Sequence, residues 1–148
     1  MKIYIGSDHN GFQLKGRLSE LLSSNNYHFI DDGDDQLNPD DDFPVFAAKV
    51  VNSILVDEDP DSRGILICGS GQGMCMAANR FKGIRACLGY DVESVRASRN
   101  DDDSNILCIP GRVLSEDSAV NLVRTWLETP FANSTRFVRR IKEMDNLN

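Results

Sequence analysis

The chain has 148 residues, of which 41% are apolar and 26% are charged. These values are ordinary for one globular domain and argue against a disordered chain, so we expect a single domain over residues 1–148. The net charge of −7 argues against nucleic acid as a partner, because phosphate backbones select basic surfaces. No apolar run approaches the ~20 residues of a membrane-spanning helix. Four cysteines without a C-x-x-C pair predict no zinc site and no disulfide framework, which indicates a reduced, cytoplasmic protein.

Strand-like and helix-like apolar patterns alternate along the chain. The expected strands are residues 3–5, 27–30, 64–68, 84–88 and 106–109. Apolar residues at helical spacing predict the helices. The expected helices are residues 12–24, 44–55, 74–79, 92–99, 115–127 and 134–144. Five strands alternating with helices predict an α/β fold with a doubly wound parallel sheet. No strand follows the last helix, so we expect that helix to reach a partner subunit.

Two segments follow strands at the edge where parallel sheets bind ligands. Residues 6–11 come after the first strand and contain Asp8 and His9, and residues 68–74 come after the third strand. A histidine at a strand end can bind phosphate, orient hydroxyl groups or shuttle a proton. The structural alternative is that Asp8 or a nearby polar residue caps the following helix.

The second segment is a glycine-rich turn with the sequence C-G-S-G-Q-G-M. Gly69, Gly71 and Gly73 let the backbone approach a ligand and turn amides toward it. The positive end of the following helix favours an anion and the thiolate form of Cys68. A thiolate facing amides suits removal of a proton beside a carbonyl, because the amides hold the resulting oxyanion. The structural alternative is a buried cysteine before a tight turn. The spacing matches neither the dinucleotide fingerprint nor a Walker loop.

Two further stretches of the chain are strongly charged. Arg136 and Arg140 lie four residues apart on one face of the last helix, where two guanidinium groups can bind a phosphate dianion. Arg112 follows the fifth strand at the ligand-binding edge and can join them. The alternative is a solvated basic face. The seven aspartates of residues 31–42 are expected to form a solvated loop, since their spacing does not match an EF-hand.

Residues 3–12 with 14–15, 64–74 with 77–86, and 103–107 with 111–113 resemble the type B ribose-5-phosphate isomerases, whose superfamily includes the two subunits of galactose-6-phosphate isomerase. The resemblance implies a flavodoxin-like, five-stranded parallel sheet with an extra C-terminal helix. It implies a homodimer or homotetramer with shared active sites, no metal and no organic cofactor. The implied activity is aldose–ketose isomerisation of a phosphorylated sugar, by default ribose 5-phosphate to ribulose 5-phosphate.

The resemblance also assigns roles by position. Cys68 would move a proton between C1 and C2 through an enediolate, with the glycine-rich turn as the anion hole and Ser70 assisting at the sugar hydroxyls. The expected catalytic residues are Cys68, Ser70, Asp8 and Asp101. The expected substrate-binding residues are His9, Gly69, Gly71, Gln72, Gly73, Met74, Asp102, Arg112, Arg136 and Arg140.

Three positions depart from the pattern of that family. The family has His-Asn before the fifth strand, where the histidine opens the sugar ring, and the matching residues here are Asp101 and Asp102. The family's Tyr-Pro is Phe43-Pro44, and a position that is often histidine is Phe137. An aspartate replaces an imidazole near pH 7 only if its pKa is raised. Two alternatives therefore stay open: an isomerase of another or an open-chain sugar phosphate, and a sugar-phosphate-binding subunit that needs a partner chain.

Overall fold

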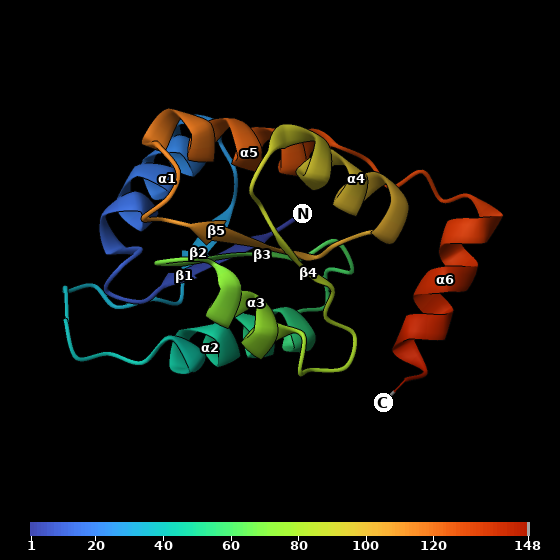
Figure 1. Ribbon diagram of the computed structural model, residues 1–148, viewed down its shortest axis with the longest axis horizontal. Helices are drawn as coiled ribbons and strands as arrows, with labels where there is room; N and C mark the ends of the chain where they lie inside the picture. Colours follow the sequence, from blue (N-terminus) through green and yellow to red (C-terminus); the bar gives the residue numbers. More distant parts are fainter. Residues whose placement is uncertain (148) are drawn as a thin grey trace.

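The computed structural model describes residues 1–147, so Asn148, the last residue of the expected domain, lies outside the described residues. Five parallel strands form one sheet in the order β2-β1-β3-β5-β4. The strands are β1 (Ile3–Ser7), β2 (Phe29–Asp31), β3 (Arg63–Cys68), β4 (Ala86–Leu88) and β5 (Ile106–Pro110). The helices are α1 (Phe12–Ser24), α2 (Phe43–Val56), α3 (Gln72–Ala78), α4 (Val92–Asp102), α5 (Glu116–Glu128) and α6 (Thr135–Asp145). Figure 1 shows α1, α4 and α5 on one face of the sheet and α2 and α3 on the other, which confirms the doubly wound arrangement.

The strand order places one point of reversal in the middle of the sheet. From β1 the chain runs outward to β2, and then returns to form β3 on the other side of β1. The carboxyl ends of the central strands are aligned, with Ser7 beside Ile67 and Cys68 beside Pro110. Ligands of open parallel sheets bind at such a reversal, so the fold itself selects the segments after β1 and β3.

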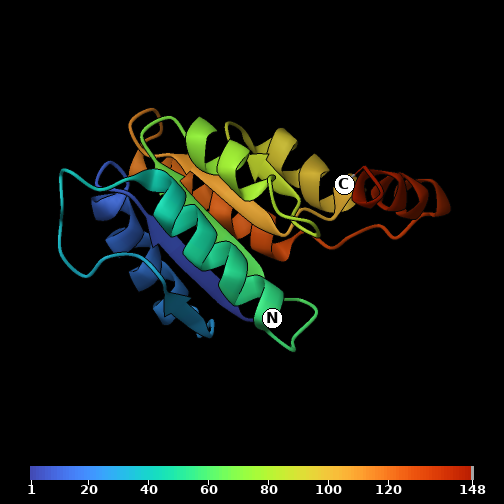
Figure 2. The same ribbon diagram turned by 90° about the horizontal axis from the view of Figure 1, so that it is seen from below.

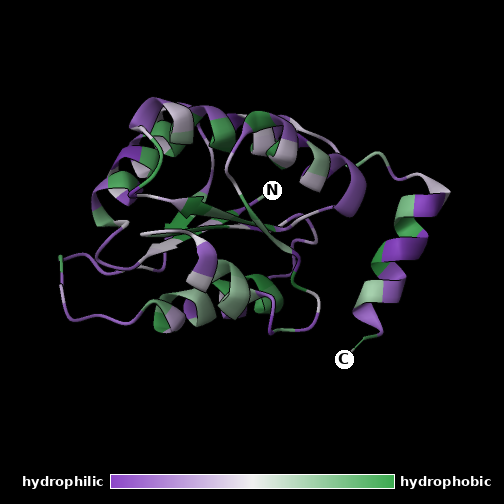
Figure 3. Cartoon of the chain, viewed as in Figure 1, coloured by the Kyte–Doolittle hydropathy of each residue, from purple (hydrophilic) through white to green (hydrophobic). Residues whose placement is uncertain are grey.

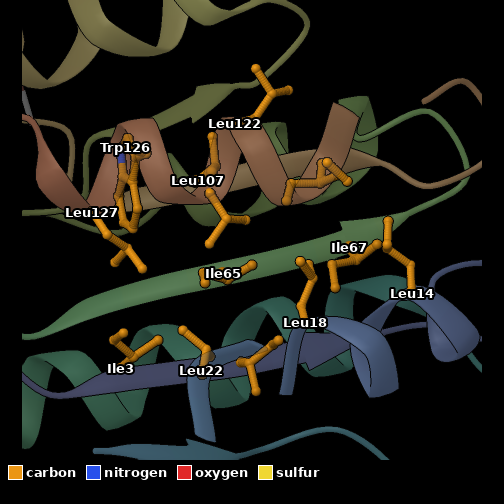
Figure 4. Close-up of a cluster of buried hydrophobic side chains, with 14 of the residues drawn as sticks. Ile3, Leu14, Leu18, Leu22, Ile65, Ile67, Leu107, Leu122, Trp126 and Leu127 are labelled. Carbon is orange, nitrogen blue, oxygen red and sulfur yellow. The ribbon is translucent and has the colours of Figure 1, made fainter. Parts of the chain in front are cut away.

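Helices on both faces bury the central strands along their whole length. Every residue of β1, β3 and β5 is buried, as expected for parallel strands that are covered on two sides. Figure 4 shows part of one core layer, in which Ile3 and Ile65 of the sheet pack with Leu22 of α1 and Trp126 of α5. A second apolar cluster lies under α2 and α3 and includes Cys68. The core therefore holds the carboxyl end of β3 rigidly.

Several boundaries differ from those expected from the sequence. Strands β2 and β4 begin two residues later than expected and lie at the two edges of the sheet. Helix α4 continues to Asp102, three residues beyond the expected end. Asp103 ends it in the left-handed conformation (φ 48°), and an ion pair of 2.8 Å joins Arg99 to Asp103 across the last turn. Asp101 and Asp102 therefore belong to a helix and not to the loop in which they were expected.

Helix α6 lies apart from the layered part of the molecule, as Figures 1 and 2 show. None of its residues is buried, and its packing is against α4. Figure 3 shows apolar and polar residues alternating along it. Phe137, Val138 and Ile141 have the spacing of one helix face, so α6 is amphipathic with its apolar side incompletely covered. Within residues 1–147, no helix combines the length and the apolar character that crossing a membrane requires.

Candidate functional site

A hollow of about 450 Å³ opens at the carboxyl end of the sheet, beside the reversal in strand order. Its walls come from the segments after β1, β3 and β5 and from the start of α2. The lining residues are Asp8, Asn10, Phe43, Cys68, Gly69, Ser70, Gly73, Arg112 and Val113. Residues predicted separately from three strand ends are thus brought into one cavity, which we call the Cys68 pocket.

Cys68 stands where the core meets this pocket. It is the last residue of β3, its side chain belongs to the apolar cluster under α2 and α3, and it is 5% exposed. Its carbonyl oxygen accepts a hydrogen bond of 2.8 Å from the amide of Gly111. The thiol is therefore held by a rigid strand and partly shielded from water, in contact with a cavity that a small ligand can enter.

The glycine-rich turn has the conformation that the sequence requires. Gly71 has a φ of 74°, a left-handed conformation that glycine adopts without strain, so consecutive amides can face one side. A Cβ atom on Gly73 would lie 2.8 Å from the ring of Phe43, so only glycine permits this contact. The Ser70 hydroxyl accepts a hydrogen bond of 3.3 Å from the amide of Gln72, the first residue of α3. Met74, predicted to bind substrate, is fully buried in the core and does not line the Cys68 pocket.

Asp8 shapes the turn before α1 and also lines the Cys68 pocket. Its Oδ1 accepts hydrogen bonds from the amides of Asn10 (2.9 Å) and Gly11 (3.2 Å), which shape the turn before α1. The N-cap residue of α1 is Gly11, so the capping role considered for Asp8 is wrong in position. The carboxylate is 5% exposed and also lines the Cys68 pocket. A carboxylate held by two amides keeps a fixed orientation toward a ligand.

His9 is paired with a residue of the acidic segment. Asp41 Oδ1 lies 2.7 Å from His9 Nδ1 and accepts a bond of 3.1 Å from the His9 amide. The Asp41 side chain is 7% exposed, so the expectation that the whole segment is solvated is wrong at this position. Ligand atoms of Asp8, His9 and Asp41 lie within 4.8 Å of one another, a donor set that suits a divalent cation. The two hydrogen bonds are enough to explain why His9 and Asp41 lie together. The expectation that the protein binds no metal stays a prediction.

Arg112 completes the polar lining of the pocket. Its amide donates a bond of 3.0 Å to the carbonyl oxygen of Gly69, which ties the segment after β5 to the glycine-rich turn. Its side chain is exposed, and among residues 1–147 the guanidinium has no ion-pair or hydrogen-bond partner. A positive charge without a carboxylate partner at this edge suits an anionic ligand.

The remaining predicted residues lie elsewhere in the chain. Asp102 lines a second hollow of about 410 Å³, together with Met144 and Leu147 near the end of α6. Burial raises the pKa of Asp102, the neighbouring Asp101 raises it further, and Arg140 lowers it. One chain thus brings Asp102 near the positive charge of Arg140, but neither residue lines the Cys68 pocket.

The arginines of α6 differ from one another in their partners. Arg139 lies 3.6 Å from Glu143 in an ion pair, whereas Arg136 lies against the ring of Phe137, 5.6 Å from its centroid. In the described part of the chain, neither Arg136 nor Arg140 has a carboxylate within ion-pair distance. The two arginines predicted to bind phosphate are therefore the ones that have no intrachain ion pair.

Several residues around the pocket were not among the predicted site residues. Asn10 and Val113 line the cavity. They directly follow the predicted residues His9 and Arg112 in the sequence. Phe43 was noted only as a departure from the family pattern, and its ring forms part of the wall. Asp41 lies 32 residues from His9, and no spacing rule connects the two.

Comparisons with known proteins agree with this geometry. The family model described as Ribose/Galactose Isomerase matches residues 3–144. Over 129 residues the chain is 39% identical to the Mycoplasma pneumoniae protein named Probable ribose-5-phosphate isomerase B, covering 87% of this chain and 84% of that protein. It is 35% identical over 141 residues to ribose-5-phosphate isomerase B of Mycolicibacterium paratuberculosis, covering 95% and 87%.

Two solved structures show the same fold. A ribose 5-phosphate isomerase from Thermotoga maritima superposes with a TM-score of 0.92 at 40% identity, covering 99% of this chain and 98% of that one. The ribose-5-phosphate isomerase B of Mycoplasma genitalium, solved with bound ribulose-5-phosphate, has a TM-score of 0.92 at 35% identity and covers 97% and 93%. These likenesses confirm the flavodoxin-like fold and the sequence resemblance. The chain belongs to the ribose/galactose isomerase family.

Proposed function

We propose that this chain is an aldose–ketose isomerase that interconverts ribose 5-phosphate and ribulose 5-phosphate. The observation that carries the proposal is the Cys68 pocket, in which a thiol, a glycine-rich turn and a carboxylate meet at the end of the sheet. The Mycoplasma genitalium relative, solved with bound ribulose-5-phosphate, supports this choice of sugar.

The proposed reaction moves one hydrogen between C2 and C1 and one between O2 and O1. The Cys68 thiolate removes the C2 proton of the open-chain aldose, and the electron pair passes to the C1 carbonyl oxygen to give an enediolate. Amides of residues 69–73 stabilise that oxyanion. The Ser70 hydroxyl, which can both donate and accept, relays the proton between the two oxygens. Cys68 then returns its proton to C1. Every step from the open-chain aldose onward is assigned to a group of the chain itself, so these steps need no metal and no organic cofactor.

The phosphate end of the site is proposed to require a second copy of the chain. Arg112 lines the Cys68 pocket, whereas Asp102 lines the other hollow, and the positive charge of Arg140 acts on Asp102. Helix α6 carries Arg136 and Arg140 on an arm with an incompletely covered apolar side. We infer that α6 and the end of α4 complete the Cys68 pocket of a partner in a homodimer, which can pair further into a tetramer. Residues 1–148 would act as one domain, and four free cysteines favour the cytoplasm.

A panel of pentose and hexose phosphates tests the function. Purified protein is expected to isomerise ribose 5-phosphate, and Cys68→Ala is expected to abolish the turnover. No turnover of any phosphate in the panel, or equal rates for wild type and Cys68→Ala, would overturn the proposal.

A second candidate function follows from Asp101 and Asp102, which stand where the family has the ring-opening histidine and the asparagine after it. An open-chain sugar phosphate needs no ring opening, so this reading predicts faster turnover of open-chain than of cyclic substrates. Equal rates on both count against it. Full activity of the homomer removes the need for a different partner chain.

A further inference from the structure

The acidic segment between β2 and α2 is anchored at both of its ends. At its start, the buried Lys15 of α1 donates to the Asp31 carboxylate (2.7 and 2.9 Å) and to the carbonyl oxygen of Asp34 (2.7 Å). At its end, Asp41 bonds to His9, which follows β1. The segment is thus attached twice to the element that leads into the Cys68 pocket.

Local structure fixes the position of Asp41 within this segment. The Asp41 amide donates to the carbonyl oxygen of Asn38 (3.2 Å), and the Asp40 amide donates to the Asn38 side chain (3.1 Å). Helix α2 begins two residues after Asp41, at Phe43. Asp40 and Asp42 are exposed, whereas the Asp41 side chain is 7% exposed. A carboxylate is withdrawn from water only where hydrogen bonds replace the lost hydration, and here both bonds come from His9.

Asp41 Oδ1 accepts two hydrogen bonds from His9, one from the backbone amide and one from the ring. The backbone amide fixes the distance between the two segments (3.1 Å), and the ring nitrogen Nδ1 fixes the orientation of the imidazole (2.7 Å). Because a carboxylate only accepts hydrogen bonds, Nδ1 must carry a proton. The second ring nitrogen, Nε2, is therefore the one that remains for a ligand. His9 lies between Asp8 and Asn10, which both line the Cys68 pocket.

We propose that Asp41 is a positioning residue, which holds His9 in the Nδ1–H tautomer and in one ring orientation, with Nε2 presented to the sugar phosphate. The proposal deepens the isomerase function proposed above and rests on it. Asp41 acts through His9, because within residues 1–147 both hydrogen bonds of its carboxylate are with that residue.

The tautomer is measured first, in the ligand-free protein by 15N NMR of the imidazole nitrogens. His28 is the only other histidine in the sequence, so His28→Gln assigns the His9 signals. Wild type and Asp41→Asn are expected to show Nδ1–H, since an amide oxygen also accepts the bond. Asp41→Ala is expected to show a mixture of tautomers, and Asp40→Asn, the matched control, the wild-type spectrum. A wild-type His9 with the proton on Nε2 alone would overturn the proposal, whatever the enzyme's activity.

The second measurement is a double-mutant cycle on kcat/KM for ribose 5-phosphate. Asp41→Ala is expected to lower kcat/KM about tenfold in the wild-type background, as other partners that orient a histidine do. In a His9→Ala background the same change is expected to have no effect. Asp41→Asn should restore most of the loss, and Asp40→Asn should match the wild type. An equal loss in both backgrounds would show a merely structural role and overturn the proposal. Absence of ribose 5-phosphate turnover in the wild type would instead refute the proposed function. The NMR result would then still decide whether Asp41 sets the tautomer of His9.

Discussion

Polar side chains at the two ends of the β-sheet differ in whether they have partners within the chain. At the amino end, Asp57 accepts hydrogen bonds from Tyr4 (2.7 Å) and Ser62 (2.6 Å) and lies 3.5 Å from the ammonium group of Lys2. At the carboxyl end, the Arg112 guanidinium has no partner in the described part of the chain. The carboxylate at the amino end is therefore neutralised within the chain, whereas the guanidinium at the carboxyl end stays available to a ligand.

This difference separates residues that stabilise the fold from residues that meet a ligand. A buried polar group without a partner is costly, so paired groups at the amino end contribute to folding. Arg63 illustrates this, because it donates to the carbonyl oxygens of Trp126 and Leu127 and pairs with Asp61. At the carboxyl end the core holds Cys68 and the turn in place without satisfying the pocket's charge. Substitutions at the two ends should accordingly change different measured quantities.

The largest effect is expected from Cys68→Ala. Loss of the proton-moving base should lower kcat for ribose 5-phosphate by about a thousandfold, the usual range for general acid–base catalysis. The melting temperature should change little, because the side chain is small and lies at the border of the core. Steady-state kinetics and thermal unfolding measure the two quantities on the same preparation.

Cys87→Ser is the matched control for this experiment. Cys87 is a half-buried cysteine of β4 that lines the other hollow and not the Cys68 pocket. The Cys87→Ser variant should keep a kcat close to that of the wild type. A Cys68→Ala variant that is unstable but as active per folded molecule as the wild type would place Cys68 among the structural residues and erase the contrast between the two ends.

An intermediate effect is expected in α6. Removing a guanidinium that binds phosphate costs about 2 kcal/mol, so Arg136→Ala or Arg140→Ala should each lower kcat/KM about 30-fold. Arg139→Ala is the control on the same helix, since Arg139 pairs with Glu143. The Arg139→Ala variant should keep a kcat/KM close to that of the wild type. Equal losses at all three positions would indicate general attraction by a basic helix instead of specific contacts.

The smallest effect on activity is expected from Asp57→Asn. Hydrogen bonds from Ser62 and Tyr4 hold the pKa of Asp57 well below its usual value. Its ionised form therefore adds stability above about pH 4, and this stability is lost as the pH falls toward its lowered pKa. The variant should melt at a lower temperature at pH 7 with an unchanged kcat, and the difference in melting temperature should shrink below pH 4. A constant difference across that range would contradict this account of the amino end.

The sequence predicted the centre of the fold better than its edges. Strands β1, β3 and β5 were recognised as short apolar runs, because they are buried on both faces. The edge strands β2 and β4 are only three residues each and lack such runs, so their starts were misplaced. The end of α4 was missed because it depends on the Arg99–Asp103 ion pair and the left-handed Asp103.

The same distinction applies to the site. The residues after β1, β3 and β5 could be predicted, because parallel strands bring their ends to one edge and the glycine spacing is visible in the sequence. Asp41 could not, since its contact with His9 joins residues 32 positions apart through an irregular segment. The separation of Asp102 and Arg140 from the Cys68 pocket is likewise a property of the folded chain. Sequence position placed them all in one site, whereas in one chain Asp102 lines a different hollow and Arg140 lies outside the Cys68 pocket.

Subunit complementation tests most directly whether two chains build one active site. Cys68→Ala and Arg140→Ala proteins, each nearly inactive alone, are mixed, dissociated and reassembled. Mixed dimers would contain one intact site, formed by Cys68 of one copy and Arg140 of the other, so the mixture should recover roughly a quarter of wild-type activity. A mixture that forms mixed dimers but stays as inactive as its components would contradict the shared site.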